Sequence, residues 1–181
     1  STPKPSSAAS DVYKRQAWVV GSLVHTALRY WRFPDQPGFE EFLHPYALEA
    51  GLTDPTEIRR TIATARRLLA RFQAHPLYTE LDQAERYHEV PYTVEVNGIS
   101  QSGIVDLLYR TEDGWTLVEF KTDELKPGTD LQAHVREKGY DEQVQSYVAA
   151  VARLLGERPR VIIVFLNIGG EVKTIPLDTM S

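Results

Sequence analysis

The sequence has no cysteine among its 181 residues. Without thiolates the chain can form no disulfide bond, no thiolate zinc site and no cysteine-ligated iron–sulfur cluster. It also lacks any run of about 18 consecutive uncharged apolar residues, which a transmembrane helix requires. We therefore expect a cytoplasmic protein with no membrane partner.

An excess of basic residues is missing as well. The chain carries 20 Lys and Arg against 25 Asp and Glu, for a net charge of -5. Proteins that bind nucleic acid are usually basic, so the total charge argues mildly against this partner. A local basic patch is nevertheless sufficient for binding, and carboxylates are the groups that a divalent cation needs. The distribution of charge matters more than its sum.

The remaining composition is that of an ordinary globular domain. At 42% hydrophobic and 25% charged residues, a chain of this length can form one core. The first ten residues are rich in Pro, Ser and Ala, so residues 1–16 are expected to be a disordered or non-native leader. The domain itself is expected over residues 17–181.

Three segments have the apolar period of a helix: 18–31, 55–72 and 140–155. The sequence Asp54-Pro55-Thr56-Glu57 predicts the start of the second helix, with Asp54 as the cap and Pro55 in the first position. The stretch between the first two helices is rich in Pro and Gly and predicts loops. Residues 122–139 are polar and predict a mobile loop.

From Tyr87 the period changes to two, which is typical of strands. Strands are expected over 87–96, 103–109, 115–121, 161–166 and 172–175, with hairpin turns at Asn97-Gly98 and near Asp113-Gly114. The third of these strands is followed by the helix 140–155 and then by the continuous apolar run 161–166, which predicts a central buried strand. This order indicates an α/β or α+β layered domain.

The chemistry of interest lies on the hairpin 103–121. Glu119 and Lys121 share one face of their strand because side chains alternate. If Glu112-Asp113 form the turn, Asp106 faces Glu119. If Asp113-Gly114 form it, Asp106 faces Lys121 and Glu119 lies on the diagonal. Both registers place the three side chains on one face, whereas a slip by one residue would separate them.

Two opposed carboxylates about 5 Å apart at Cβ destabilise a sheet unless something offsets their charge. Ile104, Leu108 and Leu117 are expected on the same face, which would half-bury the pair and strengthen the repulsion. A bound Mg²⁺ or Mn²⁺ would resolve it, and Lys121 could then hold a water or stabilise a phosphate. The alternative interpretation is a surface salt-bridge cluster. Asp106 and Glu119 each interrupt an apolar run, which weighs against that alternative.

Other polar residues have helical spacing that could place them at a site. His25 lies one turn after Gly21, which allows close approach of a backbone or ligand, although a helical His is more often only packed or exposed. Gln143 and Tyr147 lie one turn apart on one side of a helix. The helix 55–72 also carries a row of arginines that could meet phosphates, and a solvated face is the favoured interpretation of it: Arg59, Arg60, Arg66, Arg67 and Arg71.

Taken together, these residues resemble the PD-(D/E)xK nuclease signature. Gly103-Ile-Val-Asp106 is followed by Glu119-Phe120-Lys121-Thr122-Asp123, with His25 upstream on a helix and Gln143-x-x-x-Tyr147 downstream. The pattern is similar to the RecB-like nuclease domains at the C-terminal end of AddA and RecB helicase–nucleases. Glu119 stands where that branch more often has Asp, and the broader superfamily accepts either acid.

The resemblance implies a three-layer α/β, restriction-endonuclease-like fold with a mixed central sheet, and Mg²⁺-dependent hydrolysis of DNA, with Mn²⁺ as an alternative metal. It implies that His25, Asp106, Glu119 and the Phe120 carbonyl bind the metal and that Lys121 positions or activates water. Gln143 and Tyr147 would contact DNA or support the site. Because no G-x-x-x-x-G-K-[ST] motif occurs, a helicase motor would have to lie elsewhere in the native chain or complex. The alternative is a non-catalytic nucleic-acid or subunit-binding module that retains the fold.

Overall fold

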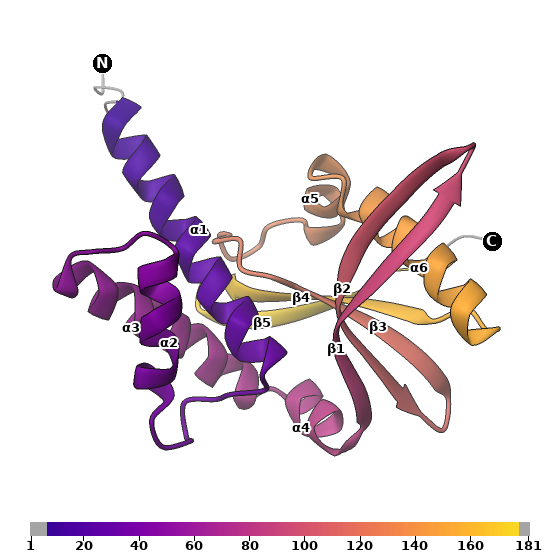
Figure 1. Ribbon diagram of the computed structural model, residues 1–181, viewed down its shortest axis with the longest axis horizontal. Coiled ribbons are helices and arrows are strands. Elements are labelled where there is room, and N and C mark those ends of the chain that lie inside the picture. Colours follow the sequence, from indigo (N-terminus) through magenta and orange to yellow (C-terminus); the bar gives the residue numbers. More distant parts are fainter. Residues whose placement is uncertain (1–6, 178–181) are drawn as a thin grey trace. The chain divides into compact units, whose positions relative to one another are not determined.

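The computed structural model describes residues 7–177. These residues divide into two compact units, 7–70 and 71–177, which we describe separately (Figure 1). No helix in the described part of the chain has both the length and the apolar character needed to cross a membrane.

The first unit consists of helices. They are α1 (Ser7–Arg29), α2 (Phe39–Glu49) and α3 (Pro55–Gln73), whose last residues belong to the second unit. The helix expected near 18–31 is present, but it begins at Ser7, so disorder is the wrong prediction for residues 7–16. Residues 1–6 of the expected leader lie outside the described residues.

The early start of α1 has a local cause. Its packed part begins at the buried Val19, and the preceding residues include Ala, Lys, Arg and Gln, which favour continuation of a helix. The Arg15 guanidinium also donates a hydrogen bond of 2.6 Å to the Gly51 carbonyl. Residues 7–16 therefore form a helix without apolar residues at helical spacing. Because that spacing was the signal used to predict helices, this part of α1 was not predicted.

Helix α2 lies where the sequence predicted loops. Phe39, Leu43 and Ala47 are buried at intervals of four residues, which supplies the apolar stripe of a helix despite Pro45 inside it. Gly38 precedes the helix with φ of 74°, a conformation that favours glycine. The density of Pro and Gly in this stretch concealed a short helical period.

The predicted start of α3 is confirmed. The Thr56 amide donates to the Asp54 side chain at 2.9 Å, and the Ile58 amide donates to the Asp54 carbonyl at 2.9 Å. These bonds satisfy amides that have no partner within the first turn of a helix.

The second unit is built on one five-stranded sheet in the order β1-β2-β3-β4-β5. Its strands are β1 (Glu85–Val96), β2 (Ile99–Thr111), β3 (Gly114–Lys121), β4 (Arg160–Ile168) and β5 (Glu171–Leu177). Strands β3 and β4 pair in parallel, and the other neighbours pair antiparallel. The expectation of a mixed sheet with five strands at these places is confirmed, and the strand ends either match the expected ones or extend up to four residues further.

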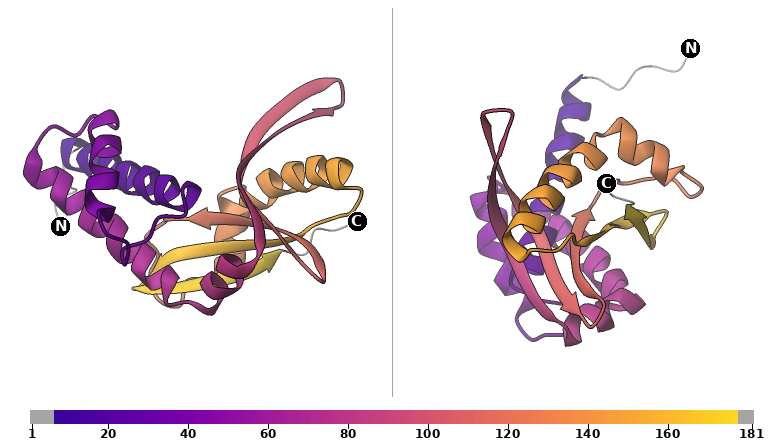
Figure 2. Two further views of the ribbon diagram at one scale, coloured as in Figure 1. Left: turned by 60° about the horizontal axis from the view of Figure 1, so that its bottom comes forward. Right: turned by 90° about the vertical axis from the view of Figure 1, so that its right-hand side faces the viewer.

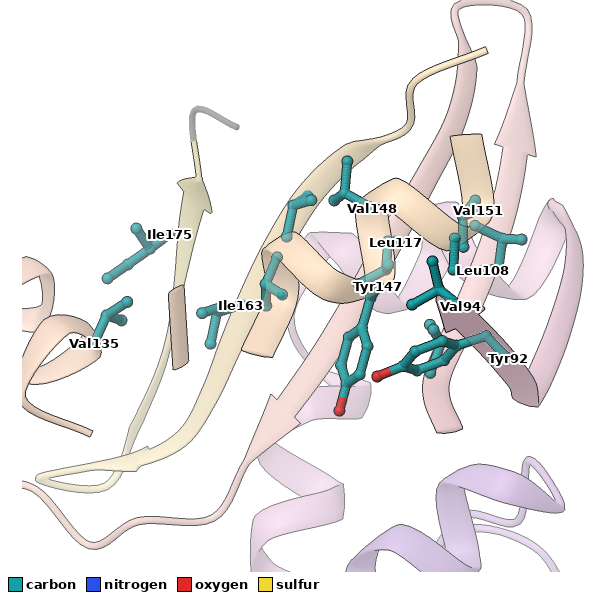
Figure 3. Packing of buried hydrophobic residues seen from close by; sticks show 14 of the residues in the cluster. Tyr92, Val94, Leu108, Leu117, Val135, Tyr147, Val148, Val151, Ile163 and Ile175 are labelled. Carbon is teal, nitrogen blue, oxygen red and sulfur yellow. The ribbon is translucent and has the colours of Figure 1, made fainter. Parts of the chain in front are cut away.

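The parallel pair is connected by α5 (Leu131–Glu137) and α6 (Tyr140–Leu155). Buried residues of α6, including Tyr147, Val148 and Val151, lie in one apolar cluster with Leu108 and Leu117 of the sheet (Figure 3). Helix α6 has the bounds that the apolar period predicted.

The segment between β3 and α6 is not the mobile loop that its polarity suggested. Leu125 pairs with Ile168 of β4, and the Leu125 amide donates to the Asn167 carbonyl at 3.0 Å. Helix α5 follows, with the Asp130 side chain accepting from the Ala133 amide at 3.1 Å and Val135 buried. A single buried apolar residue is too little for a period, so the sequence did not predict this helix.

Within this unit, other helical residues cover the opposite face of the sheet. Phe72, near the end of α3, meets Phe120 edge to face with ring centroids 5.2 Å apart. The short helix α4 (Pro76–Gln83) supplies Glu80, which accepts a hydrogen bond of 2.9 Å from the Tyr109 hydroxyl. Helical residues therefore lie on both faces of the sheet, in agreement with the expected layered fold.

The hairpin of β1 and β2 is longer than the rest of the sheet. The two strands pair from Glu85–Arg110 to Val96–Ile99, whereas β2 pairs with β3 only from Leu107 to Thr111. The outer half of the hairpin consequently projects as a two-stranded ribbon (Figure 2). Asn97 and Gly98 form its turn with φ of 52° and 76°, as their sequence predicted.

Replacement of the α3 cap tests the first unit. Asp54→Ala should lower the free energy of unfolding by about 1 kcal/mol, because the Thr56 amide loses its acceptor. Asp54→Asn keeps an acceptor oxygen and should retain most of the stability. Urea unfolding followed by circular dichroism measures both variants, and an equal loss in the two would contradict the capping role.

Candidate active site

The register of β2 and β3 decides between the two turns that the sequence allowed. Thr111 pairs with Gly114, and Leu107 pairs with Val118, so Glu112 and Asp113 form the turn. Continuing this register places Asp106 opposite Glu119. The first of the two predicted registers is therefore the one observed.

Regular pairing of the two strands stops one residue before the carboxylates, at Leu107 and Val118. Beyond that point, side-chain oxygens replace backbone carbonyls as the acceptors of the hydrogen bonds between the two strands. The Asp106 amide donates to Glu119 Oε1 at 3.2 Å, and the Phe120 amide donates to Asp106 Oδ2 at 2.9 Å. Each carboxylate thus accepts a backbone hydrogen bond from the opposite strand, which fixes the pair at the point where the strands separate.

Glu119 is the more deeply buried of the two acids, with 4% of its surface exposed. Leu108 and Leu117 are buried in the same cluster of the sheet, as expected, but Ile104 is 53% exposed and does not cover the site. Burial in first place, and the neighbouring charge of Asp106 in second, raise the pKa of Glu119 from its ordinary value of 4.5 to about 8. The Asp106 amide and the Lys121 charge act in the opposite direction without cancelling the effect.

Lys121 and the first half of α6 border this pair. Lys121 Nζ lies 3.4 Å from Gln143 Oε1 and donates to it. Tyr147, one turn further along α6, is buried, and burial followed by the charge of Glu119 raises its pKa. The structure therefore brings together five of the predicted site residues, and the group comes from two strands and one helix: Asp106, Glu119, Lys121, Gln143 and Tyr147.

His25 is partly buried on α1 and belongs to the first unit. The carboxylate pair belongs to the second unit, so the proposed metal binding by His25 stays a prediction. Among residues 7–177, no group of three or more His, Cys, Asp or Glu side chains forms a complete metal cluster.

The arginines of α3 have varied surroundings. Arg66 pairs with Glu40 at 2.9 Å, with both side chains well exposed. Arg71 is half-buried and donates to Asn167 Oδ1 at 3.4 Å. Arg59 and Arg67 donate to threonines of the preceding turn. These contacts agree with the interpretation as a solvated helix face, and phosphate binding by this row stays a prediction.

Tyr92 is a site neighbour that the sequence analysis did not single out within the expected strand 87–96. Its ring meets that of Tyr147 with centroids 4.9 Å apart, and the two side chains lie next to each other (Figure 3). Burial followed by the charge of Glu119 raises the pKa of Tyr92. The sequence did contain a signal for this position. A hairpin register centred on the Asn97-Gly98 turn pairs Tyr92 with Gly103, as the structure does.

That pairing explains the glycine that begins the Gly-Ile-Val-Asp sequence. A Cβ atom at Gly103 would lie 2.6 Å from Tyr92 Oη and 2.7 Å from Tyr92 Cε1. The tyrosine ring therefore occupies the space where any other residue would place its side chain. Gly103 allows Tyr92 to pack against Tyr147 beside the carboxylates.

Fold and site together define a class: an α/β domain with a mixed sheet that carries two opposed acids and a lysine on adjacent strands. A family model described as the PD-(D/E)XK nuclease superfamily matches residues 6–176. The chain belongs to the PD-(D/E)XK nuclease superfamily, as its motifs had indicated.

Curated relatives agree with this membership. The chain is 27% identical over 97 residues to an ATP-dependent helicase/nuclease subunit from Thermoanaerobacter sp. (strain X514), covering 54% of this chain and 8% of that protein. It is 32% identical over 120 residues to the protein of the same name from Carboxydothermus hydrogenoformans, covering 58% and 10%. The matched region is thus about a tenth or less of these relatives.

The fold is also similar to a crystal structure from Eubacterium rectale, a protein described as a candidate exonuclease. The TM-score is 0.62 at 17% identity, over 90% of this chain and 59% of the other. At this identity the likeness concerns the fold alone.

Gly103→Ala should destabilise the second unit by about 1–3 kcal/mol, because the added methyl displaces the Tyr92 ring. Gly103→Ala combined with Tyr92→Leu should recover part of that loss, since leucine leaves room for the methyl group. Thermal unfolding measures wild type, Gly103→Ala, Tyr92→Leu and the double variant. Additive losses in the double variant would show that the ring is not what excludes a side chain at this position.

The raised pKa of Glu119 predicts how stability depends on pH in metal-free protein. Between about pH 4.5 and 8 the folded protein keeps a proton that the unfolded chain releases, so stability falls as pH rises through this window. In EDTA, Glu119→Gln should remove that contribution and flatten the melting temperature between about pH 5.5 and 8.5. Glu112→Gln, at an exposed residue of the turn, is the control. Equal slopes for Glu119→Gln and wild type would contradict the assignment.

Proposed function

We propose that the chain is a Mg²⁺-dependent DNA nuclease domain that hydrolyses phosphodiester bonds in an exonuclease-like manner. The observation that carries the proposal is the opposed pair of Asp106 and Glu119 where β2 and β3 separate, with Lys121 two residues further along β3. A surface salt-bridge cluster would not bury one acid against another, as Glu119 is buried here.

The donor set fits a hard divalent cation. Two carboxylates supply oxygen ligands, which Mg²⁺ and Mn²⁺ prefer, and a cation would offset the burial and the repulsion from Asp106 that together raise the pKa of Glu119. The Phe120 amide points toward Asp106, and in an extended strand the carbonyl of the same residue points to the same side. This geometry supports the Phe120 carbonyl as a further ligand. His25 is a candidate ligand on the sequence motif alone.

When bound, the metal would supply positive charge to a phosphate oxygen and lower the pKa of a water. Lys121 would place its ammonium group beside the phosphate or the attacking water, where it stabilises developing negative charge. Gln143, which accepts from the Lys121 ammonium, would hold this group in place. Tyr147 would support the carboxylates or contact DNA from the same helix.

The relatives suggest a biological setting. Their printed names combine two activities, those of an ATP-dependent helicase and a nuclease, and this chain matches only a small part of each protein. We propose that the domain acts on DNA during recombination or repair, together with a helicase motor in the same native chain or complex. The motor would deliver DNA ends or single strands to the site.

The proposal predicts metal-dependent cleavage by the full 181-residue chain. Labelled linear single-stranded DNA should be hydrolysed with Mg²⁺ and left intact with EDTA. Asp106→Ala and Lys121→Ala should each lower the rate by about 10²-fold or more, because each removes a charge that the transition state needs. Gel analysis over time measures the rates.

Asp113→Asn is a matched control, since it removes an exposed carboxylate at the turn of the same hairpin. It should cleave DNA at the wild-type rate. Folded wild-type protein that binds labelled DNA without cleaving it would contradict the proposal and favour a non-catalytic binding module. Undiminished cleavage by Lys121→Ala would contradict the role of the lysine alone.

A further inference from the structure

The Lys121 ammonium group rests on an aromatic ring. Its Nζ atom lies 3.9 Å from the centroid of the Tyr140 ring and 3.4 Å from Gln143 Oε1. Tyr140 is the first residue of α6, and Gln143 follows within the same turn. The ring face attracts a cation through its quadrupole, and the amide oxygen adds a directed hydrogen bond.

The Tyr140 ring is held from its other end. Its hydroxyl donates to Asp123 Oδ2 at 2.9 Å, and the same oxygen lies 2.8 Å from His134 Nε2. The side chains of His134 and Asp123 are 12% and 24% exposed, so both are largely screened from water. Burial followed by the bond to Asp123 raises the pKa of Tyr140, which therefore keeps its proton and remains a donor.

His134 is fixed in turn by its neighbours. It lies on α5, and its ring meets Phe165 of β4 edge to face with centroids 5.9 Å apart. The Tyr140 ring lies 6.1 Å from it in a similar orientation. A chain of contacts therefore runs from the buried sheet through His134 and Asp123 to Tyr140 and ends at Lys121.

These contacts can hold the Lys121 side chain in one orientation while its ammonium group keeps its charge. A lysine side chain is flexible and must lose rotamer freedom to act at one place. A carboxylate in direct contact could fix it, but would also neutralise the charge that a phosphate needs. Here the Asp123 carboxylate accepts hydrogen bonds from Tyr140 and His134 and does not contact the lysine in these bonds. The Tyr140 ring contacts the Lys121 ammonium without neutralising its charge.

We propose that Tyr140, anchored by Asp123 and His134, is a positioning residue that orients the Lys121 ammonium toward the Asp106–Glu119 pair. Asp123 and His134 act only through Tyr140, and none of the three touches the substrate. The catalytic part of this inference rests on the proposed nuclease function, whereas the geometric part does not.

The geometry can be tested without activity by NMR of the lysine Hε protons, assigned with Lys121→Arg. In wild type the Tyr140 ring current should move the Lys121 resonances upfield of the other lysines. Tyr140→Leu should abolish this shift, Tyr140→Phe should keep most of it, and Asp123→Ala should reduce it because the ring loses its anchor. Tyr87→Leu, at an exposed tyrosine that also donates to a glutamate, should leave it unchanged. A Lys121 shift that survives Tyr140→Leu in folded protein would overturn the proposal.

The consequence for catalysis is tested by a double-mutant cycle on DNA cleavage. Tyr140→Leu should lower kcat about tenfold with little change in KM, and Tyr140→Phe should restore most of the rate. In the Lys121→Ala background, Tyr140→Leu should cause no further loss, because the positioned group is already gone. An equal loss in both backgrounds, or a change in KM alone, would overturn the positioning role. Wild-type protein that shows the NMR shift but cleaves no DNA would instead refute the nuclease proposal and leave the geometric inference standing.

Discussion

The second unit depends on one constraint: two acids must face each other across neighbouring strands. The backbone pairing of β2 and β3 ends at Leu107 and Val118, and the Asp106 and Glu119 side chains then accept the amide hydrogen bonds of the opposite strand. This exchange keeps the carboxylates together and partly satisfied, but it leaves like charges side by side in a buried place. The raised pKa of Glu119 is the physical sign of that conflict. A divalent cation would relieve it, which is why the geometry supports a metal-dependent nuclease in a superfamily whose model matches nearly the whole chain.

The surroundings of the pair can be understood as support for that constraint. Tyr92 and Tyr147 pack against each other, near enough to Glu119 that its charge contributes, after burial, to the raised pKa of both, and Gly103 makes room for the Tyr92 ring. On the other side, the contacts of Asp123, His134 and Tyr140 end at the Lys121 ammonium. The acids and the lysine therefore lie in different environments. Two tyrosines lie near the buried carboxyl group, while the lysine ammonium lies over a third ring that does not neutralise its charge.

The sequence predicted those parts of the fold whose signals are local or periodic. The alternation along β1 to β3, the Asn97-Gly98 turn, the Asp54 cap and the bounds of α6 all follow from short-range rules, and the structure agrees with them. Helix α2 was missed because Pro and Gly concealed its apolar period. Helices α4 and α5 were missed because each spans only about two turns, which is too short for an apolar period. The core of the site was predictable because the register of a hairpin shows which residues of its two strands share a face of the sheet, even when they are far apart in the sequence. The Tyr140 anchor was not, because His134, Asp123 and Tyr140 meet only through the packing of α5 and α6 on the sheet.

The claim that the opposed carboxylates form a metal site is tested most directly by Mn²⁺ binding, measured by electron paramagnetic resonance of the free ion. Wild-type protein should remove one equivalent of Mn²⁺ from solution. Asp106→Asn and Glu119→Gln, which keep the shape of the side chains, should each weaken binding by about tenfold or more because a charged oxygen ligand is lost. If both variants bound Mn²⁺ as tightly as wild type, the metal would lie elsewhere and the interpretation of the pair as its binding site would be wrong.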